Sequence, residues 1–269
     1  MMDIRIAMVV CNCPVGLIED NLAAMAGWVL RAVEKRAAII CFPELNITGY
    51  SSRPEILQFA QTIPGPVTDR VAAMATETGL TILAGLVEKD SSGCFFASHI
   101  VAKPDGSVGV YRKLHIAPPE QPLFTPGKQI PLFESAGIKF GIQLCYDAHF
   151  PELSTHMAEN GAELIFLPHA SPRGDATTKH QSWMRHLPAR AYDNSLFVAA
   201  VNQTGPNGLG LEFPGNGVIL GPSGDLYAEG LNGEEGLVLA DLSSEKLNYV
   251  RGHAMRYFFP NRRPELYDR

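Results

Sequence analysis

Short apolar runs alternate with longer amphipathic segments along most of the chain. In residues 17–36, Leu22, Met25, Val29 and Val33 recur near helical spacing and basic residues follow, which predicts a helix that packs one face on a core. The same pattern predicts further helices over residues 67–78, 151–160, 179–194 and 243–251. Short apolar runs predict strands over residues 4–10, 38–42, 81–87, 97–102, 108–112, 138–144, 163–167, 196–201, 218–220, 226–229 and 236–240.

Strands that are apolar throughout and alternate with helices are typically buried on both faces. The pattern therefore predicts an α/β fold with helices outside the sheets. The turn sequence KPDGS joins the strands over residues 97–102 and 108–112, which predicts a hairpin and hence mixed sheets. No linker, internal repeat or shift of composition divides the chain, so we expect residues 1–269 to form a single domain.

Composition and charge exclude several classes of protein. Hydrophobic residues make up 46% of the chain and charged residues 19%, which is typical of a globular protein with a core. The formal net charge is −6 and no Lys/Arg cluster stands out, so we expect neither a nucleic-acid nor a membrane partner. No apolar run reaches the roughly 20 residues that a membrane span needs.

The first residues and the cysteines indicate where the protein works. The opening sequence MMDIRIAMVVCNCPVG has no basic segment and no cleavage site, so it predicts a first strand and not a signal peptide. Five cysteines are an odd number and are widely spread, so we expect no disulfide framework and a reducing, cytoplasmic setting. Cys11 and Cys13 lie two residues apart without a C-x-x-C motif, and we interpret them as strand and turn residues.

Cys145 stands where a predicted strand turns into a predicted helix. The strand ends at Leu144, and Phe150, Pro151 and Glu152 are typical of a helix start. Open α/β sheets bind ligands at the carboxyl ends of their strands, and a nearby helix N-terminus would favour a thiolate. A cysteine alone at a strand end is more often a small buried residue, so a catalytic role requires partners.

Two further residues supply such partners. Glu44 follows the predicted strand over residues 38–42, and Lys113 follows the one over residues 108–112. Each alone is typical of a loop acid or a strand-edge charge. Together with Cys145 they place a base, a cation and a thiol after three different strands. A thiol with a pKa of about 8.5 needs a base or a cation to become a nucleophile, and attack on an amide carbon builds an oxyanion that an ammonium stabilises.

Three segments that hold these residues, FPELNITGY, YRKLHI and LCYDAHFPEL, resemble the signature segments of the nitrilase, or carbon–nitrogen hydrolase, superfamily. The segments GAELIFLPHAS, PARAYDNSLFVAAVNQTG and RRPELY extend the resemblance over nearly the whole chain. Three separate motifs in the right order are a specific signal. The resemblance implies an αββα sandwich of two mixed sheets with helices on both outer faces. It also implies association into homodimers or larger homo-oligomers.

The resemblance also implies roles for the three residues. Glu44 is the general base and later the general acid, Lys113 stabilises the tetrahedral intermediate, and Cys145 attacks the substrate and forms a thioester that water hydrolyses. The backbone N–H of Tyr146 is the implied second oxyanion donor. The family chemistry requires neither a metal nor an organic cofactor.

Many members of the family have a second glutamate shortly after the lysine. Glu120 in HIAPPEQPLF is the candidate for this position, and Glu134 is an alternative in a segment that predicts a strand. Arg190 and Asn194 in ARAYDN match recurrent family positions, and we interpret them as structural supports beneath the site.

The sequence also bears on the branch of the family. Tyr146 and Asp147 follow the cysteine where nitrilases proper usually have Trp and Glu, which resembles the amidase branches. Some branches bind a substrate carboxylate through an arginine in this turn. Here His149 occupies the region, and a neutral imidazole does not reproduce the bidentate contact of arginine. We interpret His149 as a residue of the helix start, with a substrate contact as the alternative. Arg173 in HASPRGD is a candidate carboxylate ligand or an exposed loop charge.

We therefore predict an enzyme that hydrolyses a small linear amide to a carboxylic acid and ammonia, with an N-carbamoyl amide hydrolase as the alternative and a nitrilase as a further one. A non-catalytic binding protein has no need of Glu44, Lys113 and Cys145 together. Acyltransferases of this superfamily are often membrane-embedded or fused to other domains, and this chain shows neither feature. A metal hydrolase is disfavoured because four candidate ligands match no known ligand spacing: His169, His180, His186 and Asp175.

Overall fold

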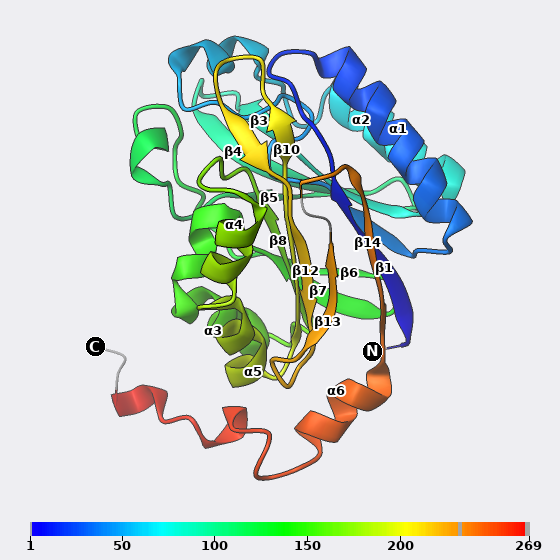
Figure 1. Cartoon of the computed structure of the whole chain (residues 1–269), viewed down its shortest axis with the longest axis vertical. Coiled ribbons are helices and arrows are strands. Elements are labelled where there is room, and N and C mark those ends of the chain that lie inside the picture. Colours follow the sequence, from blue (N-terminus) through cyan, green and yellow to red (C-terminus); the bar gives the residue numbers. More distant parts are fainter. Residues whose placement is uncertain (1, 231–232, 267–269) are drawn as a thin grey trace.

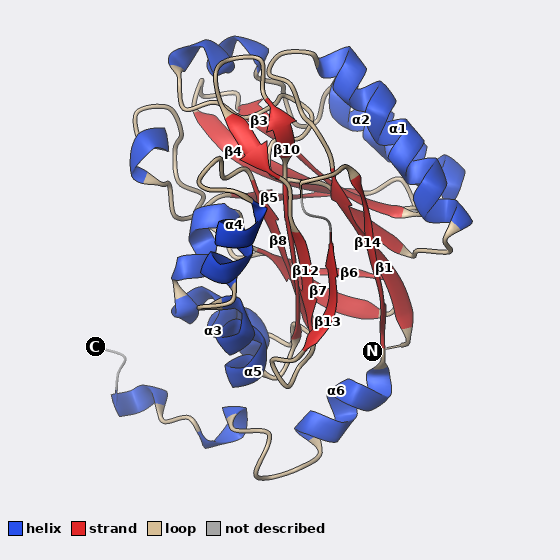
Figure 2. Cartoon of the chain, in the orientation of Figure 1, coloured by secondary structure: helices blue, strands red, loops and turns tan. Residues whose placement is uncertain are grey.

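Two six-stranded mixed sheets lie face to face in the fold (Figures 1 and 2). The computed structural model describes residues 2–230 and 233–266. The first sheet has the strand order β14-β1-β2-β3-β4-β5 and the second β13-β12-β9-β8-β7-β6. In each sheet three neighbouring strands are parallel, β1, β2 and β3 in the first and β7, β8 and β9 in the second, while the outer strands are antiparallel.

The strands have the following bounds. The first sheet consists of β1 (Ile4–Val10), β2 (Ile39–Cys41), β3 (Thr81–Lys89), β4 (Phe95–Ala102), β5 (Val108–Arg112) and β14 (Gly236–Leu242). The second consists of β6 (Phe133–Ser135), β7 (Ile138–Ile142), β8 (Leu164–His169), β9 (Phe197–Asn202), β12 (Gly217–Leu220) and β13 (Leu226–Gly230). A separate pair contains β10 (Thr204–Pro206) and β11 (Glu212–Pro214).

Helices cover the two outer faces of the sandwich. The helices α1 (Ile18–Glu34) and α2 (Pro66–Thr78) lie on the first sheet. The helices α3 (Pro151–Glu159), α4 (Ala176–Trp183) and α5 (Leu187–Asn194) lie on the second. The helix α6 (Ser244–Arg251) follows β14, and the remaining tail runs back along one end of the molecule (Figure 1). This arrangement confirms the predicted α/β sandwich of two mixed sheets.

The alternation of side chains along β1 shows how the layers are joined. Met8 and Val10 belong to the apolar cluster that also contains Phe140 of β7, so they face the second sheet. Ala7 and Val9 belong instead to the cluster that contains Leu22 of α1. Successive residues of a strand point to opposite faces, so β1 packs on the second sheet and on a helix at the same time.

Several predicted elements differ from the structure. The single helix over residues 179–194 is wrong, because the chain forms α4 and α5 with a break between them. Pro188 lies in the first turn of α5, where its missing N–H is tolerated, whereas inside a longer helix it would clash with the preceding turn. Val33 is 38% exposed, and Ala32 takes its expected buried place on α1. The three-residue strands β6, β10 and β11 are too short to show a period of their own, although Glu134 does lie in a strand as expected.

The expectations of a single domain and of a homodimer or larger homo-oligomer stay predictions. Among the helices that the structure describes, none is both long and apolar enough to cross a membrane.

The loop after β2 crosses directly over Gly85 of β3. The Gly85 N–H donates to Asn46 Oδ1 at 2.7 Å, and the Gly85 carbonyl accepts from the Ile47 N–H at 2.9 Å. A Cβ atom at Gly85 would lie 2.4 Å from the backbone nitrogen of Leu45 and 2.9 Å from Nδ1 of His99. This close approach holds the loop that carries Glu44, so residue 85 must be glycine for the loop to lie where it does.

Gly85→Ala should therefore lower the free energy of unfolding by about 1–3 kcal/mol, because the new methyl group meets backbone atoms that cannot move aside alone. Gly27→Ala is the matched control. A Cβ atom at Gly27, on the exposed side of α1, meets nothing within 4 Å. That substitution should raise the free energy of unfolding by about 0.5–1 kcal/mol. Denaturant unfolding of both variants beside the unmodified protein measures the difference, and equal stability of the two variants would contradict the close crossing.

Candidate active site

A buried ammonium between two carboxylates forms the centre of the candidate site. Lys113, directly after β5, places Nζ 2.8 Å from Oε1 of Glu44 and 2.7 Å from Oε2 of Glu120. All three side chains are buried, with exposed fractions of 0% to 3%. Burial alone would lower the pKa of Lys113, but the two carboxylates hold it well above its usual value. The ammonium therefore stays charged, and one of its three N–H donors is left for another acceptor.

Glu44 is held on both of its carboxylate oxygens. Its Oε1 accepts from Lys113, and its Oε2 accepts from the Ala170 N–H at 3.1 Å. The side-chain amide of Gln203 donates to the Glu44 carbonyl at 2.7 Å and fixes the backbone. Burial raises the pKa of Glu44 to about 7, with Lys113 opposing the rise and the charge of Glu120 adding to it. A carboxylate with a pKa near 7 can both accept and return a proton at neutral pH.

Glu120 joins this cluster as the sequence predicts. It ends a short 3-10 helix, Pro118–Glu120, and accepts from the Tyr50 hydroxyl at 2.9 Å and from the Ala117 N–H at 3.3 Å. Glu134, the alternative, lies exposed in β6 and is paired across the ladder with Lys139 of β7. The structure therefore brings Glu120, and not Glu134, to Lys113.

Cys145 opens a tight turn with a strained backbone. The strand β7 ends at Ile142, and a 3-10 helix, Cys145–His149, begins three residues later. The φ of Cys145 is +45°, a left-handed value that is uncommon for a residue other than glycine and costs free energy. Such strain persists only where the surroundings enforce it, and it is concentrated at functional sites.

Asp147 is the residue that enforces this turn. Its buried carboxylate accepts from the Leu144 N–H at 3.0 Å and from the Tyr111 hydroxyl at 2.7 Å. It also accepts from the backbone N–H of His115 at 2.8 Å. His115 lies two residues after Lys113, so Asp147 connects the segment that carries the ammonium to the turn that carries the thiol. The sequence analysis missed this role, although an acid two residues beyond a cysteine in a tight turn is a readable signal for such bonds.

The environment of Cys145 keeps its thiol protonated at rest. The side chain is partly exposed, and burial together with the charge of Glu44 raises its pKa to about 12, while Lys113 and Lys179 oppose the rise. The expectation that a helix N-terminus would favour a thiolate is therefore wrong. The helix α3 begins only at Pro151, and the nearby carboxylates and burial outweigh any such effect. Attack on a substrate consequently requires a base, and Glu44 has a suitable pKa.

The other predicted residues lie around this turn. Tyr146 follows Cys145 at the start of the 3-10 helix and packs edge-to-face on Phe150, with the ring centroids 5.4 Å apart. His149 lies exposed at the end of that 3-10 helix, before α3, and its ring centroid is 4.8 Å from that of His186. Arg173 lies exposed in the loop before α4 and forms no ion pair within the described ranges.

Two residues of the predicted support lie beneath the turn. Nε of Arg190 donates to the Ala148 carbonyl at 3.1 Å, and the Asn194 side chain donates to the Arg190 carbonyl at 2.9 Å. Both residues belong to α5, so this helix is bonded to the 3-10 helix that begins at Cys145.

Lys179 is a second residue that the sequence analysis missed. It lies on α4 and is 7% exposed, and its Nζ donates to the Ser171 hydroxyl at 2.5 Å. Its charge acts on Cys145, which places it in the neighbourhood of the thiol. Helical periodicity offered no signal for this role, because lysine on a predicted helix is typical of a solvated face.

The histidines of this region have separate partners. His169 packs its ring on Trp183, His180 pairs with Glu229 across 3.0 Å, and Nδ1 of His186 lies 3.1 Å from the Ser182 carbonyl. The Asp175 carboxylate caps α4 by accepting from the Thr178 N–H at 2.7 Å. Within residues 2–230 and 233–266, no three His, Cys, Asp or Glu side chains are grouped so as to hold a metal ion.

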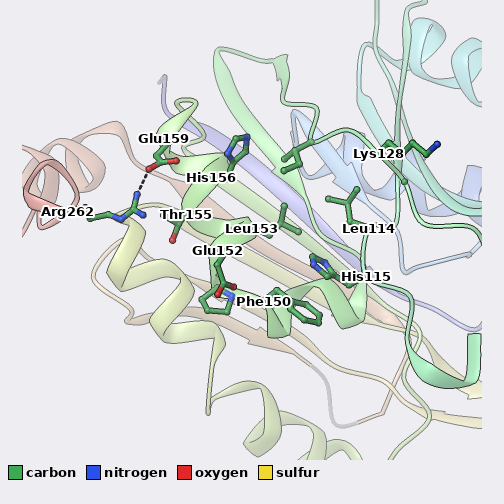
Figure 3. A pocket seen from close by; sticks show the side chains of 13 residues that line it. Leu114, His115, Lys128, Phe150, Glu152, Leu153, Thr155, His156, Glu159 and Arg262 are labelled. Atoms are coloured by element: carbon green, nitrogen blue, oxygen red, sulfur yellow. Dashed lines mark hydrogen bonds and ion pairs between the residues drawn. The ribbon is translucent and has the colours of Figure 1, made fainter. Parts of the chain in front are cut away.

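A hollow on the surface beside α3 is a different feature from this cluster (Figure 3). It has a volume of about 850 Å³ and is lined by α3, by residues 114–115, 127–128 and 130, and by Arg262 of the tail, which forms an ion pair with Glu159. None of Glu44, Lys113 and Cys145 lines it. Its lining includes His115 and Phe150, whose rings are stacked with their centroids 3.8 Å apart.

Comparison with known proteins identifies the family. The model of the carbon-nitrogen hydrolase family matches residues 5–251. The chain is similar to the nitrilase of Pyrococcus abyssi, with 29% identity over 99% of this chain and 100% of the relative. It is also 29% identical to the omega-amidase of Xenopus tropicalis, over 87% and 86% of the two chains. A third relative is the N-carbamoylputrescine amidase of Solanum lycopersicum, with 29% identity over 93% and 89%.

A solved structure is similar over nearly the same length. It is a mutant of the amidase from Nesterenkonia sp. AN1 with the acetamide moiety of fluoroacetamide covalently added at the active site cysteine. The two chains superimpose with a TM-score of 0.84 and 28% identity, over 98% of this chain and 95% of the other. The family match over residues 5–251 and this shared fold agree, and the chain belongs to the carbon-nitrogen hydrolase family of enzymes.

Proposed function

We propose that this enzyme hydrolyses a small linear amide to a carboxylic acid and ammonia through a thioester on Cys145. The observation that carries the proposal is the buried Lys113 shared by Glu44 and Glu120, beside a thiol that is protonated at rest. This arrangement supplies a cation for an oxyanion and a base for a thiol, which are the two requirements of thiol attack on an amide. The named amidases among the relatives support the same reaction.

In the first half of the reaction, the sulfur of Cys145 attacks the amide carbon while its proton passes to Glu44. The carbonyl oxygen becomes an oxyanion, which the free N–H of the Lys113 ammonium and the backbone N–H of Tyr146 stabilise. Glu44 then gives the proton to the amide nitrogen, the carbon–nitrogen bond breaks, and ammonia leaves. A thioester remains on Cys145.

In the second half, Glu44 takes a proton from a water molecule, whose oxygen attacks the thioester carbon. The tetrahedral intermediate collapses, the carbon–sulfur bond breaks, and the proton on Glu44 returns to the thiol. The carboxylic acid leaves and the enzyme is restored. Glu120 accepts a hydrogen bond from Lys113 in this scheme, which keeps the ammonium in place and helps to hold the pKa of Lys113 above its usual value.

Two relatives favour different substrates of the same chemistry. The N-carbamoylputrescine amidase of Solanum lycopersicum supports hydrolysis of an N-carbamoyl compound, which would release carbon dioxide with ammonia. The nitrilase of Pyrococcus abyssi supports a nitrile as a further substrate. The amide reading is preferred because the similar solved structure is an amidase and because Tyr146 and Asp147 follow the cysteine.

Cys145→Ala should lower ammonia release by about 10⁴-fold or more, because no other group replaces the nucleophile. The measurement uses a panel of simple amides, ω-amides, N-carbamoyl compounds and nitriles. Cys94→Ala is the matched control, since Cys94 is also a partly exposed free thiol but lies away from the cluster. Iodoacetamide should inactivate the unmodified protein and the Cys94 variant alike, and intact mass should show one adduct, on Cys145, in the inactivated Cys94 variant. Release of ammonia by folded Cys145→Ala at the unmodified rate would refute the thioester.

The pH dependence of kcat/KM should show an acidic limb centred near pH 7. Glu44 must be ionised to accept the thiol proton, and burial raises its pKa to about 7, so kcat/KM should fall about tenfold per pH unit below that value. Lys113 has a pKa well above its usual value, so it should cause no loss below pH 10. An acidic limb at pH 4–5 would show that a solvated carboxylate, and not Glu44, is the base.

The variant Glu120→Gln tests whether the acidic limb of kcat/KM reports the ionisation of Glu44. The charge of Glu120 raises the pKa of Glu44, and its removal also leaves Lys113 to Glu44 alone, so the limb should move to lower pH. The matched control is Glu134→Gln, which removes an exposed carboxylate of β6 and should leave the limb in place. If the acidic limb does not move in Glu120→Gln, the charge of Glu120 does not act on the group that serves as the base.

A further inference from the structure

Lys179 is a buried cation without a counter-ion. It is 7% exposed, and its Nζ donates to the uncharged hydroxyl of Ser171 at 2.5 Å. No carboxylate of the described residues pairs with it, whereas Lys113 has two. A buried charge is normally paired, because transfer of an unpaired ion out of water costs several kcal/mol. An unpaired buried ammonium near a candidate active site can therefore bind a group of opposite charge on a ligand.

Among the described residues, none of the groups that act on the pKa of Lys179 is a carboxylate. The groups whose charges act on it or respond to it are the Cys145 thiol, Arg173 and the histidines His149, His169 and His186. Burial and neighbouring cations lower the pKa values of these histidines, to about 4 for His186, so they are neutral. Burial likewise lowers the pKa of Lys179 itself, and Arg173 adds to this effect.

The position of the ammonium is fixed by the strand ends beneath it. Ser171 follows β8, and its backbone is bonded in both directions to the Asn202 side chain at the end of β9, at 2.9 and 3.0 Å. Lys179 thus donates to a hydroxyl on a rigid segment and not to a mobile loop. In addition, Nε2 of His169, the last residue of β8, is buried without a hydrogen-bond partner in the described structure.

We propose that Lys179 determines substrate specificity by binding a carboxylate at the far end of the amide substrate, while Lys113 serves the reacting carbonyl. This inference rests on the proposed amide hydrolysis and narrows it to amides that carry a carboxylate on a short chain. A single ammonium beside one hydroxyl matches the single charge of a carboxylate. It disfavours a substrate that ends in an ammonium group, because like charges repel in a buried site.

The test compares acid amides with neutral amides of matched shape. Succinamate, glutaramate and adipamate are each paired with the amide that has a methyl group in place of the carboxylate: butyramide, valeramide and hexanamide. Lys179→Met keeps the length and apolar stem of the side chain but removes the charge. The ratio of kcat/KM for acid amide over neutral amide should fall about 100-fold in this variant, because a buried ion pair with the substrate is lost.

Three variants separate charge from structure. Lys179→Arg keeps the charge and should retain most of the ratio. Lys246→Met removes an exposed lysine of α6 and should leave the ratio unchanged. Arg173→Met tests the arginine that the sequence suggested, and its exposed position predicts a change of less than about threefold, as for a charge at the rim of a site. A large effect of Arg173→Met with none of Lys179→Met would overturn the assignment.

A binding measurement separates this inference from the reaction itself. Calorimetry with Cys145→Ala protein needs no turnover, and the best acid amide should bind it at least tenfold more tightly than its neutral partner. The double variant Cys145→Ala with Lys179→Met should lose this preference. Equal binding of acid and neutral amides at every chain length would overturn the role of Lys179. If neutral amides are hydrolysed through Cys145 and the ratio does not respond to Lys179→Met, the proposed reaction stands and this inference fails.

Discussion

The site depends on the buried ion pairs of the Lys113 ammonium with Glu44 and Glu120. The ammonium forms ion pairs with these two buried carboxylates and so offsets part of the cost of placing their charges away from water. It also joins the end of β5 to the loop after β2, so the bond that pairs the charges also positions Glu44, the proposed base. Loss of one member of such a buried group typically costs about 3–5 kcal/mol, because the others are left uncompensated. The chemistry and the local stability of this region therefore have one physical origin.

The carboxylate of Asp147 makes the corresponding connection between the two sheets. Lys113 and Glu44 follow strands of the first sheet, whereas Cys145 follows β7 of the second. By accepting from Leu144 on one side and from Tyr111 and His115 on the other, Asp147 fixes the distance between these strand ends. The left-handed backbone of Cys145 is stable because these bonds enforce it. The thiol and its proposed base, Glu44, are thus brought together by the packing of the two sheets.

The sequence predicted those residues of the site that come directly after a strand. Glu44, Lys113 and Cys145 each follow an apolar run, and the resemblance of their motifs to one family added roles that spacing alone does not give. It could not predict the high pKa of the Cys145 thiol, because burial and the approach of Glu44 are tertiary properties. The burial of Lys179 could not be predicted for a similar reason. The pattern predicts one helix over residues 179–194, whereas the structure has a break before Pro188, and the packing of α4 buries this lysine.

The two buried lysines differ in their charge partners, and this difference affects the order of proton transfer and carbon–sulfur bond formation in the proposed reaction. Lys113 is paired with two carboxylates of the protein, whereas Lys179 is paired with none among the described residues. The charge of Lys179 partly opposes the rise in the pKa of the Cys145 thiol. A carboxylate bound to Lys179 cancels that effect, so a free thiolate is even less favourable in the complex than in the resting enzyme. In the proposed reaction, proton transfer to Glu44 would then accompany the formation of the carbon–sulfur bond and not precede it. In this way the binding of an acidic substrate would keep the nucleophile protonated until an amide carbon lies within reach of the sulfur.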